Sequence, residues 1–432
     1  MLRFDIFKRE EIKAFKKWIN KRTFLEEKVE NEVKEIIKRV KEEGDRAVLE
    51  YSQKFDSPDI TLSHIRVGPE KIKDSIKHVP AEDLKIIKEA IERITEFHKR
   101  QKEGSWIETG DDFVAGQIIR PMERVGVYVP GGQKGETPLI STLIMSAVPA
   151  KVAGVSKIVV VSPPRKDGTI NPYILATANL LEIEEIYAIG SAWAIAALAY
   201  GTETVPKVDM VVGPGNIYVT VAKKILFGEI GIDMLAGPSE IAILADKTSN
   251  PSWIASDLIS QAEHDPLASS ILISLDKELL DSVEKEIEKI LKDLPKKDIA
   301  QKSLNEWGAL VYVQDLDLGV ELVNLIAPEH LELCLEDPWS VLNRINSAGT
   351  VFLGHYTPEP VGDYFAGPNH ILPTSGTARF SSGLCVKDFY KRINFLSTNS
   401  NFIKNHAFKI ARLARIERLE AHARSVERRL EK

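Results

Sequence analysis

The sequence predicts an α/β protein with two units, each built on a parallel β-sheet covered by helices. From residue 124 onward, strand-like runs alternate with helix-like segments, as where RVGVYVPGG is followed by TPLISTLIMSAVPAKV. Strand runs such as KIVVVSPP and KVDMVVGPGN are nearly continuous in Val and Ile, which is typical of parallel strands buried on both faces. A second alternating block begins at EIAILAD and continues to SAGTVFLG, so we expect two such units.

The remaining segments are predicted to be helical. Residues 30–55 and 81–103 repeat apolar side chains every three or four positions. The segment 402–432 is strongly charged and carries a thin apolar stripe, formed by Ile410, Leu413, Ile416 and Leu419. A terminal helix of this kind is more often docked on a partner than free in solvent.

Length and composition exclude several protein classes. The chain has 432 residues, enough for two domains, and its net charge of −6 offers no basic surface for nucleic acid. Its charged start lacks the apolar core of a signal peptide, and its longest uncharged stretches are too short to span a membrane. We therefore expect a cytoplasmic protein. Cys334 and Cys385 are too few for a disulfide framework or a Cys-type zinc cluster, so any metal site must use His, Asp, Glu and amide oxygens.

Three predicted strands of the first block end in a glycine-containing turn that opens a helix. These turns are Gly131-Gly132, Gly190 and Gly213-Pro214-Gly215. We expect them to meet at the carboxyl edge of the sheet, where open α/β sheets bind ligands. The last turn is not a dinucleotide fingerprint, because the third glycine of that motif would fall at Tyr218. A glycine-rich helix start can still hold a phosphate, and such turns also serve chain geometry alone.

The stretch SQAEHDPLASS gathers polar residues where a predicted helix runs into a predicted strand. Gln261 and His264 are three residues apart, so on a helix they share a face and can both bind one metal ion. The alternative is a helix end whose polar groups face solvent. Three further histidines follow carboxylate residues: His330 after Glu329, His370 after Asp363, and His422 after Glu417. His355 and His370 receive no specific role.

These clusters suggest two kinds of chemistry. A histidine titrates near neutral pH, so Glu329-His330 is a candidate acid/base pair in which the carboxylate orients or activates water. Gln261, His264, Asp363 and His422 together offer two nitrogens and two oxygens, a donor set that suits zinc.

The chain resembles the histidinol dehydrogenase family over essentially its whole length. The motifs that carry this resemblance are RVGVYVPGG, VVGPGN, DMLAGPSE, QAEHDP, APEHLEL, GDYFAGPNHILPT and ERLEAH, in this order. The resemblance implies a homodimer of Rossmann-like α/β domains with terminal segments swapped between subunits. It also implies oxidation of L-histidinol to L-histidine, the last step of histidine biosynthesis, through bound L-histidinaldehyde, with one zinc per active site and two NAD per histidinol.

The resemblance assigns roles to matching positions. The implied zinc ligands are Gln261, His264, Asp363 and His422, and the implied catalytic pair is Glu329 and His330. The implied substrate contacts are Ser239 and Glu417 together with the zinc ligands and His330. The implied cofactor contacts are Tyr128, Asn216 and the position of Trp193. The corresponding domains are a helical arm (1–22), a catalytic zinc domain (23–126 and 240–384), a cofactor domain (127–239), and a helical tail (385–432) that completes the partner's active site with Glu417 and His422.

One position departs from the family pattern. Where the family has Gly-Gly-Ala-Gln-Ala-Ile-Ala, this chain reads GSAWAIA, so Trp193 replaces a glutamine that contacts the cofactor. The indole is bulkier, and its nitrogen cannot accept a hydrogen bond. Two placements remain open: stacking over the cofactor pocket, or filling a gap beneath the helix AIAALAY.

Two other functions are compatible with part of this residue pattern. A related zinc- and NAD-dependent enzyme that oxidises a different alcohol would share the metal ligands and the pair Glu329-His330. Glu417 disfavours an anionic substrate, because one carboxylate repels another negative charge. A zinc-stabilised assembly protein without catalysis would need the metal ligands but not that pair.

Overall fold

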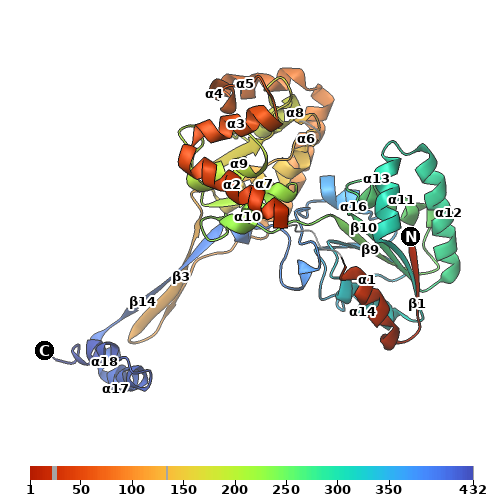
Figure 1. Ribbon diagram of the computed structural model, residues 1–432. Coiled ribbons are helices and arrows are strands. Elements are labelled where there is room, and N and C mark those ends of the chain that lie inside the picture. The colour runs from red at the N-terminus through yellow and green to blue at the C-terminus, as the bar shows by residue number, and fades with distance from the viewer. Residues whose placement is uncertain (22–26, 133–134, 432) are drawn as a thin grey trace.

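The computed structural model describes residues 1–21, 27–132 and 135–431, and it shows two lobes and a projecting ribbon (Figure 1). The first lobe contains a five-stranded parallel sheet in the order β6-β5-β4-β7-β8. Its strands are β4 (Arg124–Tyr128), β5 (Lys157–Ser162), β6 (Glu185–Ala188), β7 (Met210–Val212) and β8 (Gly231–Ile232). The predicted parallel sheet is therefore confirmed.

The helices that connect these strands are largely apolar. They are α7 (Ile140–Ala153), α8 (Pro172–Leu180), α9 (Ser191–Tyr200) and α10 (Ile217–Leu226). Nearly all of α7 and α9 is buried, because other helices cover their outer sides. This second layer explains why α9 has no charged residue and α7 has only Lys151. No helix in the described part of the chain is long and apolar enough to cross a membrane.

The covering helices come from the segment before the sheet. They are α2 (Glu27–Glu43), α3 (Asp45–Phe55), α4 (Leu62–Ile65), α5 (Pro69–Asp74) and α6 (Ala81–Lys99). Helix α2 packs on α9 and α10, α5 on α8, and α6 on α7. The family resemblance implies one catalytic domain formed by residues 23–126 and 240–384. In the structure, the apolar faces of the covering helices, which lie within 23–126, pack into the core of the five-stranded lobe instead.

The second lobe contains a six-stranded parallel sheet in the order β1-β11-β10-β9-β12-β13. Its strands are β1 (Leu2–Ile6), β9 (Glu240–Ala245), β10 (Ser269–Ser274), β11 (Gly308–Val313), β12 (His330–Cys334) and β13 (Thr350–Leu353). Its helices include α1 (Ile12–Ile19), α11 (Pro251–Ala262), α12 (Lys277–Asp293), α13 (Lys297–Trp307) and α14 (Leu316–Ile326).

The start of the chain belongs to this second lobe. The prediction of a separate helical arm over residues 1–22 is wrong, because β1 pairs with β11 as an edge strand of the sheet. Phe15 and Trp18 of α1 are buried in the same core. Their alternation with lysines makes α1 amphipathic, and its apolar face packs on its own chain.

An antiparallel ribbon carries the C-terminal helices away from both lobes (Figure 1). It consists of β2 (Trp106–Thr109), β3 (Phe113–Pro121) and β14 (Tyr390–Thr398), in the order β14-β3-β2. The helices α17 (Ser400–Ile416) and α18 (Glu420–Glu427) pack on each other beyond it. The tail 385–432 is therefore a strand followed by two helices, and it exposes large apolar side chains, among them Leu396, Phe408, Leu413 and Ile416.

Candidate active site

The predicted pair Glu329-His330 lies at the amino edge of the six-stranded sheet. His330 begins β12, and the neighbouring central strand β9 begins at Glu240. The segment 233–239 enters this edge directly from the end of the five-stranded sheet. Open α/β sheets ordinarily bind ligands at their carboxyl edge, so strand periodicity alone would not have located this site.

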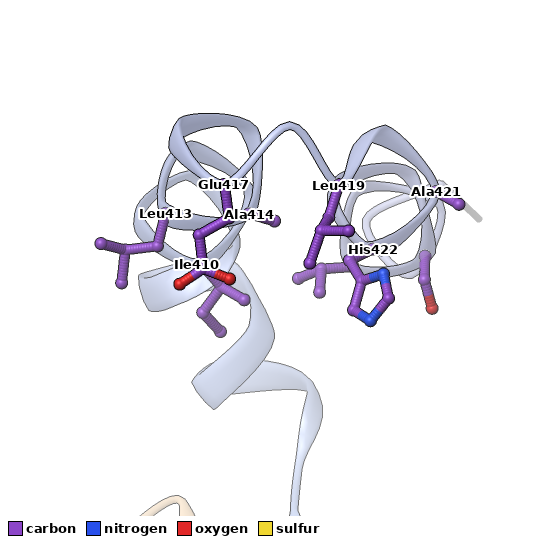
Figure 2. A pocket seen from close by; sticks show the side chains of 9 residues that line it. Ile410, Leu413, Ala414, Glu417, Leu419, Ala421 and His422 are labelled. Atoms are coloured by element: carbon purple, nitrogen blue, oxygen red, sulfur yellow. The ribbon is translucent and has the colours of Figure 1, made fainter.

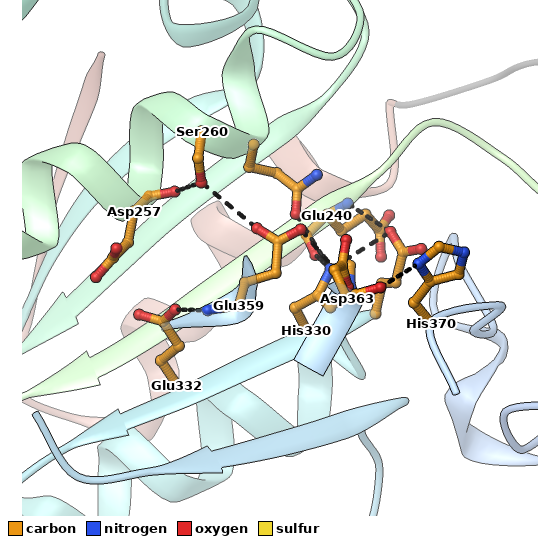
Figure 3. A network of polar contacts seen from close by, with 10 residues as sticks. Glu240, Asp257, Ser260, His330, Glu332, Glu359, Asp363 and His370 are labelled. Carbon is orange, nitrogen blue, oxygen red and sulfur yellow. Dashed lines mark hydrogen bonds and ion pairs between the residues drawn. The ribbon is translucent and has the colours of Figure 1, made fainter. Parts of the chain in front are cut away.

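His330 is buried and fixed through one ring nitrogen. Its side chain is 4% exposed, and Nδ1 lies 3.1 Å from the carbonyl oxygen of Glu240 and 3.1 Å from Oε1 of Gln261 (Figure 3). Both neighbours are acceptors, so the proton belongs on Nδ1. Burial lowers the pKa of His330 to about 3, which keeps the ring neutral. The lone pair is then on Nε2, which has no hydrogen-bond partner among the described residues.

Two carboxylates face Nε2 of His330. Oδ1 of Asp363 lies 3.7 Å away and Oε1 of Glu359 lies 4.0 Å away (Figure 3). They come from one helical turn, α16 (Glu359–Val361), and its continuation Gly362–Ala366. Burial, reinforced by the neighbouring carboxyl groups, raises the pKa of Glu359 to about 8, and burial raises that of Asp363 to about 7.

The two carboxylates, with His330 beside them, form a candidate metal site. Donor atoms of His330, Glu359 and Asp363 lie within 4.8 Å of one another. Nitrogen and carboxylate oxygen donors suit zinc, and a bound cation would offset the charge of two buried carboxylates. Nε2 of His330 is buried without a hydrogen-bond partner among the described residues, which also fits a site built for another group. Glu359 was not predicted; its place four residues before Asp363, on one face of a helical turn, was the available signal.

Glu329 is held beside the histidine. Its Oε2 accepts a hydrogen bond of 2.9 Å from the backbone N–H of Glu240 and lies 3.8 Å from Nδ1 of His330. Burial raises the pKa of Glu329 well above its ordinary range, and that N–H opposes the shift. The candidate acid/base pair is thus assembled in one buried site.

The other predicted positions of this lobe surround the pair. Gln261, in the last turn of α11, is fully buried and contacts His330. His264 follows that helix on the surface, near enough for its charge to act on His330 and His370. Nδ1 of His370 lies 3.1 Å from the carbonyl oxygen of Asp363, so His370 supports the turn that carries this carboxylate. Ser239 immediately precedes β9.

The candidate cofactor residues lie at the carboxyl edge of the five-stranded sheet. Tyr128 ends β4 and Asn216 caps α10 after the adjacent strand β7, where the strand order reverses. Ligands bind at such a switch point in open α/β sheets. The hydroxyl of Tyr128 accepts a hydrogen bond of 3.1 Å from the backbone N–H of Ser191, at the start of α9. Asn216 is exposed beside the turn Gly213–Gly215.

Trp193 lies in the core beneath the covering helices. It is 3% exposed, and its ring stacks on Tyr51 and Phe55 of α3 at centroid distances of 5.7 Å each. Its Nε1 donates to the hydroxyl of Ser52 at 3.2 Å. These contacts match the second of the two placements, in which the indole fills a gap at α9.

Glu417 and His422 are far from His330 in the same chain. Both line a shallow groove between α17 and α18, with Leu419 between them (Figure 2). Figure 1 places these helices at the end of the ribbon, away from the lobe that contains β9 and β10. Within one chain, the structure therefore assembles Gln261 and Asp363 at His330 but does not bring His422 to them.

Comparison with known proteins identifies the family to which this chain belongs. The family model for histidinol dehydrogenase matches residues 19–430. The chain is 54% identical over 406 residues to histidinol dehydrogenase of Oleidesulfovibrio alaskensis, covering 94% of each chain. It is 51% identical to that of Nitratidesulfovibrio vulgaris, covering 92% of this chain and 91% of the relative. A crystal structure of histidinol dehydrogenase from Elizabethkingia anophelis matches with a TM-score of 0.93 at 38% identity, covering 100% of this chain and 98% of that one.

Proposed function

Since the chain belongs to the histidinol dehydrogenase family and is thus an oxidoreductase, we propose that it oxidises L-histidinol to L-histidine in two steps at His330. The first step converts the alcohol to an aldehyde that stays bound, and the second converts the hydrated aldehyde to the carboxylate. The observation that carries this proposal is the buried, neutral imidazole whose free Nε2 faces Asp363 and Glu359.

His330 acts as the general base in both steps. Hydrogen bonding at Nδ1 leaves the lone pair on Nε2, which accepts the hydroxyl proton as the carbon loses hydride. Because the ring is buried, it is neutral at the start of each step. The second step repeats this transfer on the hydrated aldehyde. With one water added, the two oxidations transfer two hydrides and release two protons, and ionisation of the product acid to the carboxylate releases a third.

Glu329 activates the water that adds to the aldehyde between the two steps. Its carboxyl lies 3.8 Å from the ring of His330 and is held by the N–H of Glu240. A carboxylate in this position accepts a proton from water as the oxygen attacks the aldehyde carbon. No cysteine nucleophile is required, in keeping with the burial of Cys334 outside this cluster.

The proposal includes two bound groups. Zinc fits Gln261, His264, Asp363 and His422 of a second subunit, with Glu359 beside them, and NAD fits the edge between Tyr128 and Asn216. When bound, zinc supplies a fixed positive charge that orients the substrate, and NAD supplies the hydride acceptor. The chain's own residues then determine where the hydroxyl lies relative to His330.

We propose that the C-terminal helices of a partner subunit complete this site. His422 and Glu417 share one groove, on helices that expose apolar side chains and project from the body. A projecting segment of this kind is stabilised by docking on another subunit. In the substrate, the ammonium group suits the carboxylate of Glu417, which favours histidinol over an anionic alcohol.

A subunit-mixing experiment tests the shared site. His330→Ala and His422→Ala homodimers should each be inactive, while their mixture should regain activity, because one hybrid site draws its intact residues from both chains. Subunit exchange is checked separately with two affinity tags. If the tags show exchange and the mixture stays inactive, the shared site is wrong.

A further inference from the structure

A second buried carboxyl group lies next to the site and has no part in the chemistry above. Glu332 follows His330 by two residues on β12, so both side chains lie on one face of the strand. Glu332 is 1% exposed. A carboxyl group is almost never buried this fully without specific partners, so its contacts indicate its role.

One of these contacts fixes the turn that carries Asp363. The backbone N–H of Glu359 donates a hydrogen bond of 2.9 Å to Oε1 of Glu332 (Figure 3). Glu359 is the first residue of α16, and the N–H groups of a first helical turn have no partner within the helix. Glu332 satisfies this donor from the neighbouring strand. The position of Asp363, four residues further on, is thereby tied to the strand that carries His330.

A further contact reaches the helix that carries Gln261. The carboxyl group of Glu332 lies close enough to that of Asp257, on α11 one turn before Gln261, for each to affect the pKa of the other. Ser260, on the same helix, places its hydroxyl 2.8 Å from the carbonyl oxygen of Asp257 and 3.5 Å from Oε2 of Glu359. Glu332 therefore joins the three elements that bring Gln261, His330 and Asp363 together.

We propose that Glu332 is a positioning residue for the metal site. It touches neither a predicted zinc ligand nor the reacting atoms directly, but it fixes the distance between β12, α11 and the turn 359–363. Residues that orient ligands in this way typically change metal affinity about 10–100-fold when they are replaced. The inference rests on the proposed function, because it requires a metal at this site.

The test compares substitutions that keep or remove these contacts. Glu332→Gln retains an oxygen for the N–H of Glu359 and an amide for Asp257, so zinc affinity should stay at the wild-type value. Glu332→Leu removes both contacts and should weaken zinc binding about 10–100-fold. Glu332→Asp keeps a carboxyl group but withdraws it by one methylene, so it should also weaken binding. Affinity is measured by competition with a chromophoric chelator, which requires no turnover.

A matched control separates positioning from stability. Leu333 is fully buried on the opposite face of β12, so Leu333→Ala should lower the free energy of unfolding and leave zinc affinity unchanged. If Glu332→Leu and Glu332→Asp both fold and bind zinc with wild-type affinity, the positioning role of Glu332 is wrong, while the proposed metal site still stands. If Glu332→Leu does not fold, Glu332→Asp decides the same question. Absence of zinc binding by the wild-type protein would instead refute the metal site of the proposed function.

Discussion

Replacing Lys223 should destabilise the five-stranded lobe strongly. Lys223 of α10 forms a buried ion pair with Asp233, and the two side chains are 3% and 0% exposed. Nζ of Lys223 also donates to the carbonyl oxygen of Gly213 at 2.9 Å, while the N–H of Gly213 donates to Oδ2 of Asp233 at 2.7 Å. The pair thus holds both backbone groups of the glycine that opens the candidate cofactor turn.

Lys223→Met leaves the Asp233 charge buried without its partner. Removing one member of a buried ion pair costs about 3–5 kcal/mol, so the free energy of unfolding should fall by that amount. The adjacent Lys224 is a matched control, because its ion pair with Glu30 is exposed and should contribute at most about 1 kcal/mol. Guanidinium unfolding followed by circular dichroism measures both variants. Equal losses for Lys223→Met and Lys224→Met would refute this reasoning.

Three further outcomes are expected. Trp193→Ala should lower the free energy of unfolding by about 3–5 kcal/mol with little change in the KM for NAD, whereas a large rise in that KM at unchanged stability would place the indole on the cofactor. Burial raises the pKa of Asp56 to about 7, so the folded state holds a proton that the unfolded state releases from about pH 4 upward. The free energy of unfolding should therefore fall as pH rises from about 4 to 7. Urea titrations should show a smaller fall for Asp56→Asn. His330→Asn should slow the first hydride transfer about 10²–10⁴-fold in single-turnover assays, while Glu329→Gln should slow mainly the step after the aldehyde; equal defects in the first transfer would contradict this division.

Strand and helix patterning predicted both parallel sheets because their strands are buried on both faces. The Val- and Ile-rich runs at β5 and β7 have no polar alternation, and their connecting segments match helices α8 to α10. The pairing of β1 with β11 was not predictable from the same signal. Its contacts join residues about 300 positions apart, and local periodicity carries no information on such pairings.

The site was predicted only in part, because local motifs reveal some of its residues and long-range contacts determine the others. Glu329-His330 and Asp363 stood out as local motifs, and the structure brings them together around Gln261. Glu359 gave only the weak signal of its spacing from Asp363, and Glu332 gave none, because its role depends on the contact between β12 and a turn about 27 residues away. Trp193 was ambiguous, because its placement depends on the stack with Tyr51 and Phe55, which come from a distant helix.

The most direct test of the central claim is the amount of NADH formed per L-histidinol consumed by the zinc-loaded protein with excess NAD. Two sequential oxidations at His330 predict two NADH per L-histidinol, with L-histidine as the product and no free aldehyde trapped by a carbonyl reagent. One NADH per substrate, with aldehyde released, would contradict the two-step site, and no NADH would contradict histidinol as the substrate.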